Sequence, residues 1–154
     1  MYEVRDGEAQ ALFDDLKRWL WLKAQPDAPV LVVTREMQIL DEMWHCFILF
    51  TEEYASFCEH YCGGFVHHHP TTHVEEAAMR AAYREAPAAF MERRRAGLTA
   101  QYEYIFDMLG EETLLRWYVE YPRRYDRAFF ARAYKPPRPP ELPVEIDPVL
   151  RPRE

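Results

Sequence analysis

The clearest helical pattern in the chain is residues 35–50, REMQILDEMWHCFILF. Apolar side chains recur there at three- and four-residue steps and share one helix face: Met37, Leu40, Met43, Trp44, Phe47 and Ile48. Thr34 precedes the segment as an expected N-cap, and Glu36 lies in the first turn, where the helix dipole favours an acidic side chain. The segment therefore predicts an amphipathic helix with one buried face.

Helical periodicity also dominates the rest of the chain up to residue 134. An apolar stripe predicts a first helix over 8–25, and a helix over 52–61 should stop at the glycine pair that follows it. A helix is expected over 75–94, with Pro87 forcing a kink or a restart, and further helices over 98–109, 113–121 and 123–134. We therefore expect an all-α fold, a compact bundle of about five to six helices.

Proline marks the segments that should not be helical. Residues 65–70, FVHHHP, are expected to form an irregular His-rich loop, because Pro70 disfavours helical geometry at the preceding residue. Seven of the twelve prolines lie in residues 135–154, which predicts an extended, polyproline-II-like segment. We divide the chain into a single helical domain, 1–134, and a Pro-rich extended C-terminal arm, 135–154. The arm's apolar residues favour packing in a groove of this domain or of a second subunit, so a homo-oligomer is one expected arrangement.

Composition excludes several classes of function. Acidic residues outnumber basic residues by 26 to 19, and the formal net charge is −7 at pH 7. This balance argues against nucleic-acid or anionic-membrane partners, which require a basic surface. The chain lacks the glycine-rich loops that cradle phosphate, so no nucleotide cofactor is expected. No apolar run approaches the ~20 residues that span a bilayer and no signal-peptide pattern is visible, so we expect a cytoplasmic protein.

The histidines and cysteines are concentrated in one part of the chain. All six histidines and all three cysteines lie between residues 45 and 73. Imidazole and thiolate groups are the usual protein ligands of iron, zinc and copper, so this window predicts a transition-metal site. Cys58 and Cys62 are four residues apart on a predicted helix, but they lack the C-x₂-C spacing of structural zinc sites. Buried free thiols are the alternative for this pair.

Two segments supply the candidate metal ligands. Asp41 and His45 lie four residues apart, on one face of the 35–50 helix at the edge of its apolar stripe. The carboxylate can orient the imidazole or bind the metal itself. Side chains alternate in an extended His67-His68-His69 run, so His67 or His68 is the candidate that joins His45. The alternatives are a half-buried histidine that hydrogen-bonds to an aspartate, and a polar loop without ligands.

The motif around these residues resembles a known family. The segment DEMWHCFIL at 41–49, followed by Tyr54, Cys58, Gly64 and HHHP at 67–70, is similar to the glycine-rich domain-containing protein-like family, which has small bacterial members. The similarity covers about residues 10–95. It implies a helical fold and a shared site made of Asp41, Trp44, His45, Tyr54, Cys58, His67 and His68. Many members carry a second histidine where this chain has Phe47, so the resemblance implies a site built on His45 with His67 or His68 rather than on an H-x-H pair.

These observations leave three kinds of function open, and they do not establish whether the chain is an enzyme. The first is a His/carboxylate transition-metal site in a non-haem metal-dependent biosynthetic or modifying enzyme, or in its accessory protein. The second is a non-catalytic module that binds a peptide or protein partner. The third is a structural hydrogen-bond cluster in which the Trp44 and His45 region joins two helices.

Overall fold

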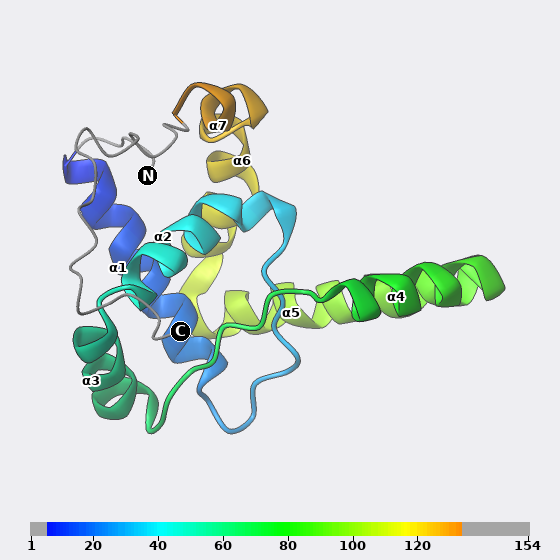
Figure 1. Ribbon diagram of the computed structural model, residues 1–154, viewed down its shortest axis with the longest axis horizontal. Helices are drawn as coiled ribbons and strands as arrows, with labels where there is room; N and C mark the ends of the chain where they lie inside the picture. The colour runs from blue at the N-terminus through cyan, green and yellow to red at the C-terminus, as the bar shows by residue number, and fades with distance from the viewer. Residues whose placement is uncertain (1–5, 134–154) are drawn as a thin grey trace, which may run out of the picture.

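The computed structural model describes residues 6–133, and all regular structure in this range is helical (Figure 1). The all-α prediction is therefore confirmed. No helix of these residues combines the length and hydropathy that a bilayer-spanning segment requires. The predicted arm, 135–154, and its boundary at residue 134 lie outside the described residues, so the division of the chain stays a prediction.

The helices are connected by short turns, except after the first and the third α-helix. In chain order they are α1 (Asp6–Lys23), a 3₁₀ turn (Arg35–Met37), α2 (Gln38–Ile48), α3 (Thr51–Cys62), α4 (His73–Glu85), α5 (Pro87–Leu115), a π-helical segment (Arg116–Glu120), α6 (Tyr121–Arg124) and α7 (Arg127–Ala133). Two irregular segments matter for the candidate site. They are residues 28–34, between α1 and the 3₁₀ turn, and residues 65–72, between α3 and α4.

Glycine and proline end the helices where the sequence predicts. Gly63 has a φ of 70° at the C-cap of α3, a left-handed conformation that glycine adopts without steric cost. Pro87 occupies the first turn of α5, where its missing N–H leaves no helical hydrogen bond unmade. The N-cap predicted at Thr34 is not formed by its side chain, which makes no capping hydrogen bond. The helical segment begins instead with a 3₁₀ turn.

The second half of the chain differs from the expected series of short helices. The segments predicted at 75–94 and 98–109 are instead α4 and one long helix, α5. The helical backbone is interrupted at Gly110 as expected, because its φ of 83° and ψ of 168° are not helical, and α5 consists of two helical stretches that meet at this kink. Pro122, by contrast, lies in the first turn of a helix, α6, although a stop was expected before it.

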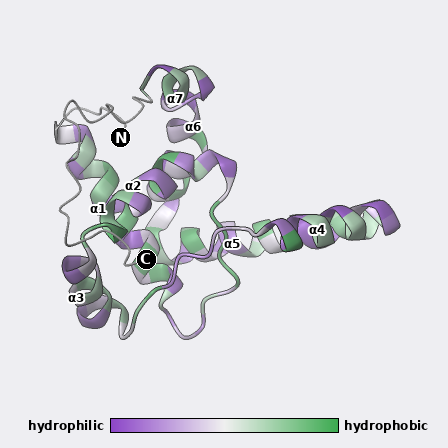
Figure 2. Cartoon of the chain, in the orientation of Figure 1, coloured by the Kyte–Doolittle hydropathy of each residue, from purple (hydrophilic) through white to green (hydrophobic). Residues whose placement is uncertain are grey.

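The hydrophobic core lies where α1, α2 and α3 meet the C-terminal part of α5 and the π-helical segment. Its largest fully buried side chains include Trp19, Trp117 and Tyr54. The Trp19 and Trp117 rings pack edge to face, with their centroids 6.0 Å apart, and so join the first helix to the π-helical segment. By contrast, α4 buries none of its residues, and together with the first part of α5 it projects from this core (Figure 1). Polar and apolar residues alternate along these projecting helices (Figure 2).

A buried carboxylate on α1 connects this helix to the π-helical segment and α6. Asp15 on α1 is only 1% exposed and accepts two hydrogen bonds from the Arg116 guanidinium, at 2.7 and 2.9 Å. Tyr121 donates a third at 2.6 Å and Arg18 a fourth, also at 2.6 Å. Because both carboxylate oxygens are satisfied, the charge can be buried, and the network fixes α1 against the start of α6.

Candidate metal centre

Asp41 and His45 project from the same side of α2. The helix buries Leu40 and Trp44, and this fixes which way its remaining faces point. Residues four apart are neighbours on a helix surface, so the Asp41 carboxylate and the His45 imidazole lie beside one another at the edge of the core. The sequence therefore places two metal-ligating groups side by side by local geometry alone.

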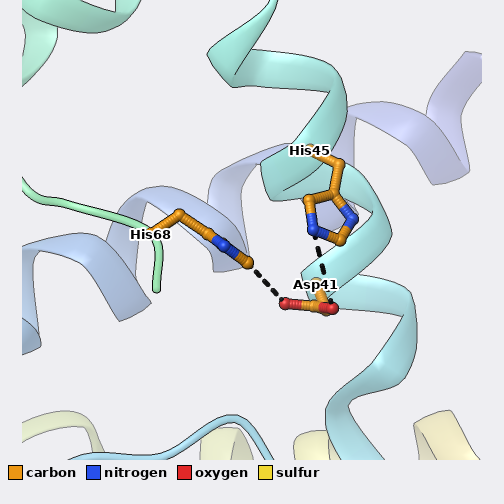
Figure 3. Close-up of side chains that lie close together, drawn as sticks. All are labelled: Asp41, His45 and His68. Atoms are coloured by element: carbon orange, nitrogen blue, oxygen red, sulfur yellow. Dashed lines mark hydrogen bonds and ion pairs between the residues drawn. The ribbon is translucent and has the colours of Figure 1, made fainter. Parts of the chain in front are cut away.

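The third group comes from the loop after α3. His68 Nε2 lies 3.0 Å from Asp41 Oδ1, within hydrogen-bond distance, and His45 Nε2 lies 4.0 Å from Asp41 Oδ2. The Asp41 carboxylate thus interacts with both imidazoles, as Figure 3 shows, and the two rings pack against each other with centroids 4.6 Å apart. One ligand atom from each of the three residues lies within 4.8 Å of the other two. Asp41, His45 and His68 could therefore hold a metal ion together, and we call them the Asp41–His45–His68 cluster.

The cluster is open to solvent on one side. The His68 side chain is 15% exposed and Asp41 is 29% exposed, whereas His45 is 50% exposed. The buried side is formed by the Trp44 indole, which packs edge to face against the His68 ring with centroids 4.5 Å apart. An ion in the cluster would thus have protein on one side and accessible coordination positions on the other.

A short hydrogen-bond relay positions the loop that carries His68. Trp44 Nε1 donates to the Tyr54 hydroxyl at 3.0 Å, and this hydroxyl donates to the backbone carbonyl of Val66. The relay connects α2 and α3 to the chain two residues before His68. Burial raises the pKa of Tyr54, which keeps the hydroxyl protonated so that it can donate.

The predicted lining residues lie at different depths. Trp44 touches His68 directly, and Tyr54 acts on the loop through Val66. Cys58 is fully buried on α3 behind Tyr54 and does not reach the cluster. Burial, followed by the neighbouring Cys58, raises the pKa of the Cys62 thiol to about 11. Cys62 is thus a protonated thiol, and neither cysteine of the pair forms a disulfide.

His68, rather than His67, joins the cluster. The His67 ring packs instead against Phe65, at 4.9 Å between centroids, and against His69 at 5.8 Å. This is the alternation expected of an extended chain, since successive side chains point to opposite sides. His67 and His69 still line the wider cleft around the cluster, but the three-residue group does not include them.

Two features of the site escaped the sequence reading. Glu42 Oε2 lies 4.0 Å from His45 Nδ1, within ion-pair range, and the signal for it was the i, i+3 spacing on one helix. Glu42 thus faces the Nδ1 side of the imidazole, and Asp41 faces the Nε2 side at the same distance. The second feature is a cleft of about 820 Å³ that opens beside the cluster. Its far wall is formed by residues 30–35 and Lys23. The spacing of these residues in the sequence does not indicate that they lie near α2.

Comparison with known proteins corrects the expected family. The matching family model is described as UCP032817-like and spans residues 2–92, so the resemblance to the glycine-rich domain-containing protein-like family is wrong. The expected resemblance covered about residues 10–95, nearly the same part of the chain, so the error lies in the family assigned. The match extends from before α1 into α5 and includes the whole cluster. No curated protein and no solved structure matches the chain.

Proposed function

The chain belongs to the UCP032817-like family, and from the geometry of the Asp41–His45–His68 cluster we propose that it binds one divalent transition-metal ion, iron(II) in preference to zinc or copper. The observation that carries this proposal is the convergence of one carboxylate and two imidazoles from two separate parts of the chain. Two histidines and one carboxylate with open positions are the ligand set typical of non-haem iron(II) sites. The absence of a thiolate from the set also favours iron(II) over softer metals.

The spacing of the ligand atoms supports this. At metal–ligand distances of about 2.1 Å, two ligand atoms held at a right angle are about 3.0 Å apart. The distance between Asp41 Oδ1 and His68 Nε2 has this value already. His45 Nε2 lies farther away, 4.0 Å from Asp41 Oδ2, and its half-exposed ring, which packs against the His68 ring, would turn toward the ion on binding. Metal binding would displace the proton that the imidazole of His68 shares with Asp41.

The number of ligands favours a reactive site over a structural one. Structural metal sites usually enclose the ion with four protein ligands, whereas catalytic sites retain a position for water or substrate. The cluster supplies three groups, and its open side faces the 820 Å³ cleft. We therefore propose that the protein is a small non-haem metal-dependent enzyme that acts on a molecule held in this cleft. In it, Asp41, His45 and His68 would hold the ion and Glu42 would orient His45.

Metal content tests the proposal directly. Untagged protein, purified without chelator and then reconstituted anaerobically with iron(II), should contain close to one metal ion per chain by ICP-MS. The variants His45→Ala, His68→Ala and Asp41→Asn should lose the metal while keeping the helical circular-dichroism spectrum. Matched controls are His67→Ala in the same loop and His60→Ala on α3, both of which should retain it.

Two results would contradict the proposal. The first is folded wild-type protein that takes up no metal during reconstitution with iron(II), zinc or cobalt(II). The second is a His68→Ala variant with a lower melting temperature and unchanged metal content. The second result would identify the bond between His68 and Asp41 as a structural link between the loop and α2.

A further inference from the structure

Two basic side chains line the same cleft as the cluster. Lys23 lies in the last turn of α1, and Arg35 lies at the start of the 3₁₀ turn. Lys23 Nζ donates one hydrogen bond, to the Leu31 carbonyl at 3.3 Å. Within residues 6–133, neither basic group forms an ion pair with a carboxylate. An ammonium group has three N–H donors, so Lys23 keeps two for a ligand in the cleft.

The acidic groups of the cleft have other partners. Asp41 belongs to the cluster, and Glu42 lies beside His45. Glu75 closes the N-terminus of α4, where it accepts from both the backbone N–H and the hydroxyl of Thr72 at 2.8 Å. These three carboxylates outnumber Lys23 and Arg35 by one, but a bound divalent ion reverses the balance. The occupied cleft therefore carries a net positive charge and attracts an anion.

The walls of the cleft favour an organic anion over an inorganic one. Val30 is 85% exposed and Val32 is 48% exposed, and both belong to the cleft wall. Pro70 adds an apolar surface from the loop that carries His68. A volume of about 820 Å³ is in the range of small-molecule sites, which combine apolar walls with a few charged groups.

We propose that the cleft binds an organic carboxylate, whose carboxylate group pairs with Lys23 while its other end reaches the open metal positions. The inference rests on the metal site proposed above. Burial lowers the pKa of Lys23, as expected for an ammonium group that lacks an anionic partner, and a bound carboxylate would supply that partner. Arg35, exposed at the mouth of the cleft, would draw the anion toward it.

The test uses cobalt(II)-loaded full-length protein, whose visible spectrum reports ligands at the metal. Succinate, glutarate and 4-hydroxybenzoate are titrated, because each has a second oxygen-bearing end that can reach the metal, with succinamide, glutaramide and 4-hydroxybenzamide as uncharged controls of similar shape. At least one carboxylate should bind and perturb the spectrum, and its amide should bind about tenfold more weakly or not at all. Lys23→Met should weaken carboxylate binding about tenfold at unchanged metal content, and Lys23→Arg should restore most of it.

A matched control is Lys17→Met, because Lys17 lies on the same helix and pairs with Asp14 at 2.6 Å, away from the cleft. Its carboxylate affinity should equal that of the wild type. Equal binding of acids and amides, no binding of any acid, or full affinity in Lys23→Met would each overturn the carboxylate site while leaving the metal site intact. Wild-type protein that takes up no metal would overturn both proposals, and metal analysis before each titration separates the two cases.

Discussion

The side-chain amide of Gln101 forms both hydrogen bonds that the backbone of Val32 offers, although the two residues are 69 positions apart in sequence. Gln101 Oε1 accepts from the Val32 N–H at 2.8 Å, and Gln101 Nε2 donates to the Val32 carbonyl at 3.0 Å. The amide also donates to the Tyr118 hydroxyl at 2.6 Å. One buried side chain thus replaces the neighbouring strand that an extended apolar segment would otherwise need, and it fixes the cleft wall against α5.

Replacing Gln101 with leucine should destabilise the fold and loosen the cleft wall. The substitution preserves bulk but leaves the N–H and carbonyl of Val32 without their partner, which should cost about 2 kcal/mol in the free energy of unfolding. Urea unfolding followed by circular dichroism measures the loss. The control is Gln10→Leu, an exposed glutamine on α1 that bonds only Asp14. Equal stability of the two variants would show that the Val32 groups are satisfied by water.

Asp15→Asn should be among the most destabilising single substitutions in this chain. It removes the charge that Arg116 and Tyr121 surround and leaves a largely buried guanidinium without its anion. We expect a loss of about 2–4 kcal/mol, measured by urea unfolding at pH 7. Asp14→Asn next to it should change stability by less than about 0.5 kcal/mol, because the ion pair of Asp14 with Lys17 is well exposed. Similar losses in the two variants would refute the role assigned to burial.

The same pair of variants tests a pH dependence. Burial alone would raise the pKa of Asp15, but the hydrogen bonds from Arg116 and Tyr121 outweigh it and hold that pKa below its ordinary value. A carboxyl whose pKa is lowered on folding stabilises the protein above its unfolded pKa of about 4 and loses this contribution as the pH falls further. The stability difference between wild type and Asp15→Asn should therefore shrink below about pH 4. A difference that stays constant down to pH 2.5 would exclude the linkage.

Tyr54→Phe should weaken metal binding without removing a ligand. The substitution deletes the hydroxyl that accepts from Trp44 and donates to Val66, so the loop before His68 loses its fixed position. Groups that orient metal ligands typically contribute about 10–100-fold in affinity, and we expect a loss in this range by competition with a chelating indicator. Tyr61→Phe, at an exposed position on the same helix, is the control. Unchanged affinity in Tyr54→Phe would mean that the loop is held by other contacts.

Replacing each of two glycines of α5 with alanine should change the free energy of unfolding in opposite directions. Gly110 has a φ of 83°, so Gly110→Ala places a side chain in left-handed backbone and should destabilise by about 1–2 kcal/mol. Gly97 lies within α5, and the kink at Gly110 is the helix's one departure from helical backbone, so Gly97→Ala should stabilise by about 0.5–1 kcal/mol. An added Cβ meets nothing within 4 Å at either position, so backbone conformation alone is tested. Thermal unfolding of both variants provides the comparison, and a shift of the same sign in both would contradict the argument.

Local signals in the sequence predicted the first half of the fold. Three signals depend only on residues close together in the sequence, so they can be recognised without tertiary information. They are the apolar periodicity of α2, the glycine that ends α3 and the proline that begins α5. The same holds for the neighbouring positions of Asp41 and His45 on one helix. The break expected between residues 94 and 98 is absent, and Gly97 lies inside α5, because glycine only weakens a helix and does not forbid it.

The remaining features depend on contacts between distant residues. The choice of His68 over His67 follows from the way Tyr54 holds Val66, and the far wall of the cleft follows from Gln101. Sequence spacing carries no information about either contact, since each joins residues on different elements. The spacing could therefore name the candidate ligands, but it could not choose among the histidines of the loop or find Lys23.

Asp41 and His68 lie on either side of α3 in the sequence, 27 residues apart, so the contact between them closes a ring of chain that contains this whole helix. Packing of Trp44 against His68 and the bond from Tyr54 to Val66 also hold this ring closed. An ion bound by the cluster would strengthen the closure and restrict local opening of the segment inside the ring. Removal of the metal should therefore speed proteolysis of residues 49–66.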